Sequence, residues 1–221
     1  MKKQFFVSLL SFFFAMIYCT TAAAESAGVV LAAIGQVNIL RNGQAIPAVR
    51  KAELQAQDEV RTIGKDARAQ LRFADGTVTT LGGNTSFLIR QYQFNAQGDK
   101  PNNAAFTLLT GAFRTVTGKI LDAHGSTFVV NTPVGTIGIR GTDFWGGYLD
   151  GNNVDVLLID GKHAVEVTNA TGKVMLEKPG QGVTLKSSQS PLAVKVWPQK
   201  KVERAVATIT WPEGSTPPTQ L

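Results

Sequence analysis

Hydrophobic and polar side chains alternate along most of the chain with a period of two residues. The alternation is plain at 36–39 and 68–73, and it recurs at 136–140. Successive side chains of a strand point to opposite faces, so this period is typical of half-buried β-strands. Shorter runs of the same kind predict further strands at 106–109, 113–117, 127–130, 154–159, 162–167, 173–176 and 182–185.

Dipeptides that favour tight turns stand between these runs. They are Asn42-Gly43, Asp75-Gly76, Asp150-Gly151 and Asp160-Gly161. Glycine adopts a positive φ without strain, and Asn and Asp tolerate it, which is what a tight hairpin requires. No fixed repeat length emerges. The pattern therefore predicts an all-β single domain of many short, mostly antiparallel strands, arranged as a β-roll, a sandwich or a solenoid-like stack.

Helical periodicity is confined to one segment near the C-terminus. Val202, Ala205, Val206 and Ile209 are spaced at i, i+3, i+4 and i+7. This spacing favours a short amphipathic helix over 200–209, with an edge strand as the alternative. We expect at most this one helix.

Three other segments lack a strand or helix pattern. Residues 48–57 and 95–105 predict loops. Three prolines and no apolar run in 212–221 predict a disordered tail. Trp197 and Trp211 are large aromatic residues, which are usually buried, so we expect the chain to pack on the β domain up to about residue 211.

The first 24 residues differ in character from the rest. Lys2 and Lys3 precede an apolar run at 5–17, and Ala22-Ala23-Ala24 offers a small-residue cleavage site. This layout is that of a secretory signal peptide, and the run is shorter than the ~20 residues of a membrane span. We expect cleavage after Ala24 and a periplasmic or secreted protein of a Gram-negative-type envelope. The expected organisation is a signal peptide at 1–24, a β domain at 25–190 and a C-terminal extension at 191–221.

Charge excludes one class of partner. The chain has 22 basic and 16 acidic residues, and cleavage would remove only Lys2 and Lys3 from this balance. So weak and dispersed a positive charge is no footprint for nucleic acid. One local basic cluster consists of Lys195, Lys200, Lys201 and Arg204. A solvated helix face is the favoured interpretation of the cluster, and attraction to an anionic surface is the alternative.

Groups that catalyse reactions or bind metals are scarce. The single cysteine, Cys19, lies in the predicted signal peptide, where the bulky Tyr18 before it disfavours lipid attachment. His124 and His163 each lie near a turn signal and predict solvent-exposed turn residues. We therefore expect no cofactor, no metal and no enzyme. The alternative is a hydrolase that uses Asp143 with Asp155 or Asp160, because glycosidases place two carboxylates ~5–10 Å apart.

The most distinctive segment is TPVGTIGIRGTDF at 132–144. Pro133 cannot donate to a strand ladder, so we expect a strand to end there. The guanidinium of Arg140 has five donors, with which we expect it to satisfy several loop carbonyls. The candidate structural residues of this segment are Thr132, Pro133, Gly135, Arg140, Gly141, Thr142 and Phe144, with Asp75 and Gly76 of an earlier hairpin.

This segment resembles the signature of the FecR-domain family, T-P-x-(small)-x-x-x-(apolar)-R-G-T-x-F. Other motifs of the family match in order at 35–39, 54–62, 71–77, 108–114, 160–167 and 180–181. The resemblance covers about residues 28–190. It implies a periplasmic, all-β, non-enzymatic domain.

The resemblance also implies a role. In the best-known members the domain belongs to a transmembrane regulator of iron-uptake genes, which senses an outer-membrane transporter and controls a cytoplasmic sigma factor. Here the signal peptide stands in place of the cytoplasmic segment and anchor, and 191–221 is too short for their second subdomain. We therefore expect only a binding or scaffold module to carry over.

The predicted function is that of a non-enzymatic exported protein which binds another envelope protein or surface component in a sensing or scaffold role. Trp145 and Tyr148 are candidate contact residues, on condition that they are exposed, because exposed aromatic residues mark interfaces. The alternatives are a carbohydrate-active or other hydrolytic enzyme of the envelope, and a structural module of a secretion or adhesion assembly.

Overall fold

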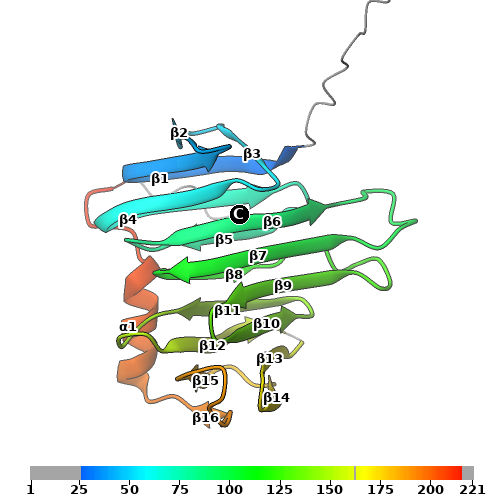
Figure 1. Ribbon diagram of the computed structural model, residues 1–221, viewed down its shortest axis with the longest axis vertical. Helices are drawn as coiled ribbons and strands as arrows, with labels where there is room; N and C mark the ends of the chain where they lie inside the picture. The colour runs from blue at the N-terminus through cyan, green and yellow to red at the C-terminus, as the bar shows by residue number, and fades with distance from the viewer. Residues whose placement is uncertain (1–25, 162, 216–221) are drawn as a thin grey trace, which may run out of the picture.

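The strands of the computed structural model form one continuous sheet that folds back on itself into two facing layers (Figure 1). The structure describes residues 26–161 and 163–215. The predicted signal peptide and the last six residues of the predicted tail lie outside these ranges. In chain order the elements are β1 Ser26–Arg41, β2 Gln44–Pro47, β3 Glu53–Gln55, β4 Glu59–Phe73, β5 Val78–Leu81, β6 Ser86–Gln93, β7 Asn103–Thr110, β8 Ala112–Val116, β9 Thr127–Thr132, β10 Gly135–Ile139, β11 Thr142–Gly147, β12 Val154–Gly161, β13 Val165–Asn169, β14 Gly172–Leu176, β15 Gln181–Leu185, β16 Lys195–Val196 and α1 Gln199–Ile209.

The long strand β4 joins the two layers. Its first residues, 59–61, pair with β6, and its last residues, 69–72, pair with β5. The first layer continues from β6 through β7, β9, β10 and β13 to β14. The second layer continues from β5 through β8, β11, β12 and β15 to β16. Strand β1 pairs with β4 along nearly its whole length and closes this end. The predicted all-β, mostly antiparallel fold is confirmed, in the form of a flattened roll.

The chain winds between the layers as it proceeds. After β6 and β7 it crosses to β8, returns to β9 and β10, crosses again to β11 and β12, and alternates in the same way to β16 (Figure 1). Because β8 lies in the other layer, β7 and β9 become neighbours and run parallel, while the other pairs of strands between residues 26 and 196 are antiparallel. This winding explains the solenoid-like spacing of the short strands.

An unbroken row of aromatic rings fills the space between the layers. Phe87 of β6 contacts Phe113 of β8 across the core, with ring centroids 5.4 Å apart. The row extends through Phe106 and Phe73 on one side and through Phe144 on the other. Each of these side chains is fully buried or nearly so. Burying one phenylalanine side chain contributes ~1.5–3 kcal/mol to the free energy of unfolding, so this row supplies much of the stability of the fold.

Three of the four predicted turns are present. Asn42 and Gly43 both have positive φ, 50° and 78°, and join β1 to β2. Gly76 and Gly151 likewise have positive φ, at 89° and 60°. The fourth prediction is wrong, because Asp160 and Gly161 are the last residues of β12 and pair with Asp143 and Thr142 of β11.

Two predicted loops are shorter than expected. Strand β7 begins at Asn103, inside the predicted loop 95–105, because Ala104 is fully buried in the core. The predicted loop 48–57 contains β3, whose Leu54 is also fully buried while its backbone pairs with β1. In both segments a single inward apolar side chain is too weak a signal of alternation.

The predicted helix is confirmed as α1, and the alternative of an edge strand is excluded. Its apolar stripe lies on the outer surface of the second layer, against Trp145 and Leu157. The residues of the stripe are Val202, Ala205, Val206 and Ile209. Gly82 lets the end of α1 approach the sheet closely, since a Cβ there would lie 2.5 Å from the carbonyl oxygen of Thr208. No helix in the described ranges is long and apolar enough to cross a membrane.

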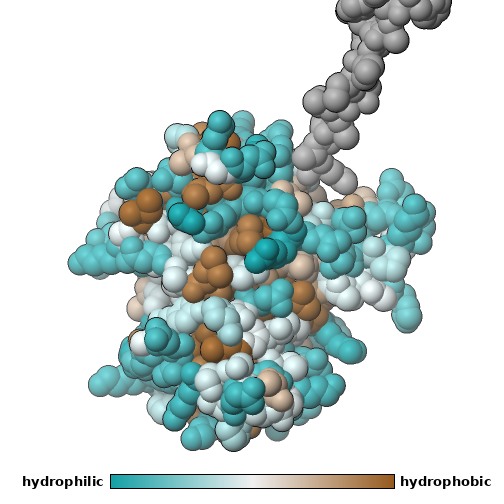
Figure 2. Space-filling view, in the orientation of Figure 1, coloured by the Kyte–Doolittle hydropathy of each residue, from teal (hydrophilic) through white to brown (hydrophobic). Residues whose placement is uncertain are grey.

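The outward face of the first layer offers no broad apolar surface. In Figure 2, small hydrophobic patches over β6, β7 and β9 are separated by hydrophilic side chains. Among the described residues, the exposed large hydrophobic side chains are Ile46, Val49, Ile63, Leu109, Val116 and Val196. Scattered exposures of this kind are ordinary for a folded surface.

Candidate functional site

The first half of the signature segment is a structural hairpin between β9 and β10. The Oγ1 of Thr132 accepts hydrogen bonds from the backbone N–H groups of Val134 (3.3 Å) and Gly135 (3.1 Å), and donates to the Gly135 carbonyl (2.8 Å). Pro133 sits exposed at the corner. A Cβ at Gly135 would lie 2.5 Å from Leu185 of the other layer, so only glycine fits. These residues hold the fold together.

The second half of the segment carries the chain from one layer to the other. Gly141 has φ of 93°, which glycine adopts without strain. Thr142 is buried, and its backbone N–H donates to Thr117 Oγ1 at 2.8 Å. The prediction for Arg140 is wrong, because its side chain is exposed and makes no hydrogen bond with the described residues. The crossing needs a left-handed glycine and a threonine anchor, and the arginine points away from it.

The aromatic residues at the end of the signature and just after it are buried or half-buried. Phe144 packs in the core against Phe113, at 5.4 Å between ring centroids. Trp145 points to the opposite face of β11, where α1 covers it completely, and its Nε1 donates to Thr208 Oγ1 at 2.9 Å. Tyr148 is half-buried, and burial raises the pKa of its phenol. Trp145, at 0% exposure, fails the condition set for a contact residue, and this expectation is corrected.

The earlier hairpin is organised around the carboxylate of Asp75. Its Oδ1 accepts hydrogen bonds from the phenol of Tyr92 (2.7 Å) and from the N–H of Thr77 (3.2 Å). Its Oδ2 accepts from Thr77 Oγ1 (2.5 Å) and from the N–H of Ile120 (3.0 Å). Burial, then the neighbouring Asp75 charge, raises the pKa of Tyr92 far above its usual value. Asp75 therefore ties β5, β6 and the 118–120 segment together.

The structure brings both histidines to one groove. His124 and His163 line a hollow of about 670 Å³ on the first layer, together with Arg140 and Glu166. Both histidines are exposed, as predicted. Glu166 forms an ion pair with Lys173, at 3.2 Å. In the part of the chain that the structure describes, no three His, Cys, Asp or Glu side chains are placed to hold a metal ion.

The carboxylates of the hydrolase alternative are engaged or far apart. Arg114 donates to both oxygens of Asp143, at 2.8 and 2.5 Å. Asp160 lies opposite Asp143, whereas Asp155 lies opposite Gly147. Four residues of β11 separate Asp143 from Gly147, so Asp155 lies about 13 Å along the strands from Asp143 and Asp160 at the usual rise per residue. Neither Asp143 nor Asp155 is an available member of a catalytic pair.

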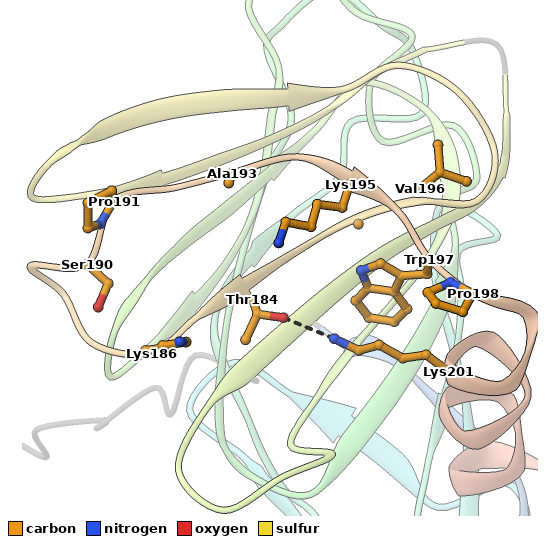
Figure 3. Close-up of a pocket in the computed structure, with 11 residues that line it drawn as sticks. Thr184, Lys186, Ser190, Pro191, Ala193, Lys195, Val196, Trp197, Pro198 and Lys201 are labelled. Atoms are coloured by element: carbon orange, nitrogen blue, oxygen red, sulfur yellow. Dashed lines mark hydrogen bonds between the residues drawn. The ribbon is translucent and has the colours of Figure 1, made fainter.

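A second groove, here the basic groove, lies at the far end of the second layer (Figure 3). It has a volume of about 490 Å³, and β15, β16, the 186–194 segment and the start of α1 surround it. Its polar and aromatic lining consists of Thr184, Lys186, Ser190, Lys195, Trp197 and Lys201. No acidic residue is among the lining residues, so the groove presents positive charge.

Lys201 is fixed in place at the edge of this groove. Its Nζ lies 2.6 Å from Oδ1 of Asp155, 3.0 Å from Thr184 Oγ1 and 3.9 Å from the centre of the Trp197 ring. The Asp155 side chain is 1% exposed, while that of Lys201 is 25% exposed. A cation over an indole face is attracted by the ring electrons, so the three contacts act together. Lys201 therefore orders the wall between α1 and β15.

The basic cluster predicted from the sequence divides into two kinds of residue. Lys201 and Arg204 are paired, with Asp155 and Asp150 respectively. Lys195 and Lys200 are exposed and make no ion pair with the described residues. Sequence reasoning missed Lys186, which lies nine residues before Lys195 and which the turn after β15 brings to the same groove. Nothing in the local pattern around it signals this proximity.

Two solved structures have a fold similar to that of this chain. Two crystal structures of a candidate anti-sigma factor from Parabacteroides distasonis are similar to this chain, each with a TM-score of 0.51 and with 18% and 19% identity. Each alignment covers 66% of this chain and 62% of that protein, so the chain spans less than two-thirds of its length. At such identity the likeness shows the fold alone. No curated protein matches the chain.

The family comparison covers more than half of the sequence. A family described as "FecR protein" matches residues 58–175, from the start of β4 to the end of β14. The matched range contains the Asp75 hairpin, the β9–β10 hairpin and the layer crossing at Gly141. The chain belongs to the FecR protein family.

Proposed function

We propose that this chain is an exported FecR-domain protein that binds another protein or a surface component of the cell envelope, in a sensing or scaffold role and without catalysis. The observation that carries the proposal is the family match over 58–175. The fold shared with a candidate anti-sigma factor supports a regulatory rather than a catalytic role. The proposal assigns the bound component to the cell envelope, and the experiment below is designed to identify it.

The use of the buried carboxylates supports this assignment. Asp58, Asp75 and Asp155 are each almost completely buried. Asp58 receives a bidentate pair of hydrogen bonds from Arg41, both at 2.7 Å, while Asp75 and Asp155 are bonded as described above. A catalytic acid or base needs oxygens that can reach substrate. These carboxylates instead accept hydrogen bonds that hold neighbouring segments of the fold together.

The N-terminal sequence supports an envelope location. Lys2, Lys3, the apolar run and Ala22-Ala23-Ala24 have the order that export machinery recognises. An exported β domain without cysteine after cleavage needs no disulfide chemistry to fold in an oxidising compartment. The binding partner is accordingly expected in the periplasm or on the cell surface.

The test uses the full chain, with a C-terminal tag, in a Gram-negative host. We expect the protein in the periplasmic fraction, with Glu25 as its first residue by mass spectrometry. Photo-crosslinking followed by reciprocal capture should then identify one envelope component, and the purified pair should bind. A control chain without 2–24 should stay in the cytoplasm and form no such crosslink.

Two results would contradict the proposal. One is full-length protein that keeps residues 1–24 and stays in the cytoplasmic fraction. The other is an exported protein whose crosslinks never yield a component that binds the purified chain. Turnover of an envelope polysaccharide by the purified protein would favour the hydrolase alternative instead.

A further inference from the structure

The free positive charge of the basic groove comes from two lysines, one on β16 and one just after β15. Lys195 extends from β16 and Lys186 from the end of β15, and Figure 3 shows the Lys195 amine pointing into the groove. Neither lysine makes an ion pair with the described residues. Lys201 completes the set, although Asp155 already balances its charge. The groove therefore has two uncompensated cations and no acid among its lining residues.

The start of α1 adds to this charge. Pro198 is the N-cap of this 11-residue helix, and it makes no side-chain capping hydrogen bond. The first turn of the helix contains no acidic residue, and Pro198 and Lys201 both line the groove. Helix N-termini have partial positive charge and are normally balanced by acidic side chains. Here the helix end reinforces the two free lysines.

Strand β16 supplies a backbone edge beside these charges. It pairs with β15 on one side and is the last strand of its layer. The N–H of Trp197 points to β15, where it donates to the Gly180 carbonyl at 2.9 Å. Backbone groups alternate in direction along a strand, so those of Val196 face away from β15. The Val196 side chain is 75% exposed, the highest exposure of the large hydrophobic residues described.

The chemistry of this edge selects among anionic partners. A sugar ring needs an open aromatic face, but Trp197 is buried and Lys201 covers its ring. A lipid surface is flat, whereas both lysines line a hollow. Lys195 on the edge disfavours pairing with a second copy of the same strand, as edge lysines do. The site needs a partner that offers both strand pairing and negative charge. An extended acidic peptide offers both, because its backbone can pair with β16 while its carboxylates reach the lysines.

We propose that the basic groove and the outer edge of β16 bind an extended acidic segment of a partner protein. The segment adds a strand beside Lys195 and Val196 and places carboxylates against Lys186 and Lys195. This inference deepens the proposed function and rests on it, because it assigns the chemistry and the site of the envelope partner.

The test measures binding of a labelled ten-residue peptide in which glutamate alternates with valine or threonine, by fluorescence anisotropy. The matched variants are Lys186→Glu/Lys195→Glu and, as control, Lys100→Glu/Lys119→Glu, which makes the same charge change at exposed sites elsewhere. We expect the groove variant to bind at least about tenfold more weakly, since two attractions become repulsions, and the control to stay within about twofold. Thermal unfolding checks that both variants are folded.

Further probes separate the contributions of backbone and charge. The same peptide with alternate amides N-methylated cannot pair with a strand and should bind at least about tenfold more weakly. Phosphatidylglycerol vesicles and polygalacturonate should bind more weakly than the peptide at equal charge. The proposal is overturned if the N-methylated peptide, the vesicles or polygalacturonate bind as tightly as the unmodified peptide. It is also overturned if the groove variant and the control variant bind the peptide equally, or if the unmodified protein does not bind the peptide at low salt.

The partner identified by crosslinking distinguishes this inference from the function on which it rests. Reduced crosslinking of Lys186→Glu/Lys195→Glu, with the control unchanged, supports the acidic-segment site. Equal crosslinking of both variants overturns the site and leaves the proposed function standing. Loss of the partner from the unmodified protein contradicts the proposed function itself.

Discussion

The buried ion pair behind the basic groove gives a quantitative test of how the C-terminal segment is attached. Lys201→Ala removes the ammonium that contacts Asp155, Thr184 and Trp197. The carboxylate of Asp155 then remains in a site where it is 1% exposed, next to the single donor Thr184 Oγ1. We expect this variant to be markedly less stable than the unmodified protein.

The magnitude follows from the burial of the two partners. Removing one partner of a buried ion pair costs about 3–5 kcal/mol. The lower end applies here, because Lys201 is 25% exposed and its removal lets water approach Asp155. Loss of the cation–ring contact adds about 0.5–1 kcal/mol. The expected loss is therefore about 3–4 kcal/mol, which for a domain of this size lowers the melting temperature by roughly 10 °C.

Urea unfolding followed by tryptophan fluorescence measures this loss, since Trp145 and Trp197 are both buried and lie 6.3 Å apart. Arg204→Ala is the matched control, because its pair with Asp150 is exposed, and it should leave the urea midpoint unchanged. The double variant Lys201→Met with Asp155→Asn removes both charges and should recover most of the loss. A loss below about 1 kcal/mol for Lys201→Ala would refute the reasoning that Asp155 is desolvated and dependent on this lysine.

Two further predictions concern packing and pH. Gly182→Ala places a Cβ 2.4 Å from the Trp197 ring and should cost about 1–3 kcal/mol by urea unfolding, whereas Gly138→Ala, with its nearest atom at 3.9 Å, should be close to neutral; equal effects would contradict the packing of the C-terminal segment on β15. The raised pKa of Tyr92 means that the folded protein keeps the phenol proton more tightly than the unfolded chain, whose tyrosines titrate near 10.0, so this contribution to stability is complete below that pH and falls as pH rises above it. The urea midpoint measured from pH 8 to 12 should decline less steeply for Tyr92→Phe, and parallel declines would contradict the role of burial and of the Asp75 charge.

Much of the fold follows from local patterns, because most inward positions of the short strands are apolar. The predicted strands at 127–130 and 173–176 lie within β9 and β14. Strand β6 was not predicted, since a bulge between Ile89 and Gln91 breaks its alternation. The folding of one sheet into two layers could not be predicted either. It depends on which part of β4 pairs with β5 and which with β6, and both pairings satisfy the same alternating pattern.

The candidate site was harder to predict than the fold, because it depends on proximity. The sequence places Lys195 and Lys201 in one cluster but gives no sign that Asp155 neutralises only the second of them. Trp145 illustrates the same limit from the other direction. Alternation along β11 sends its side chain away from the core, which suggests exposure, and only the docking of α1 buries it.

The positions of the family match and of the basic groove suggest a division of labour within the chain. The matched residues 58–175 include the hairpins and the layer crossing that build the roll of this chain. The lining residues of the basic groove all lie after 175. Trp197 packs directly against Gly182 of β15 and so holds this segment on the second layer. Changes in this segment can alter the charge of the groove without disturbing the aromatic core between the layers. For the binding site proposed above, the determinants of partner choice are therefore expected after β14, on a scaffold whose signature residues serve folding.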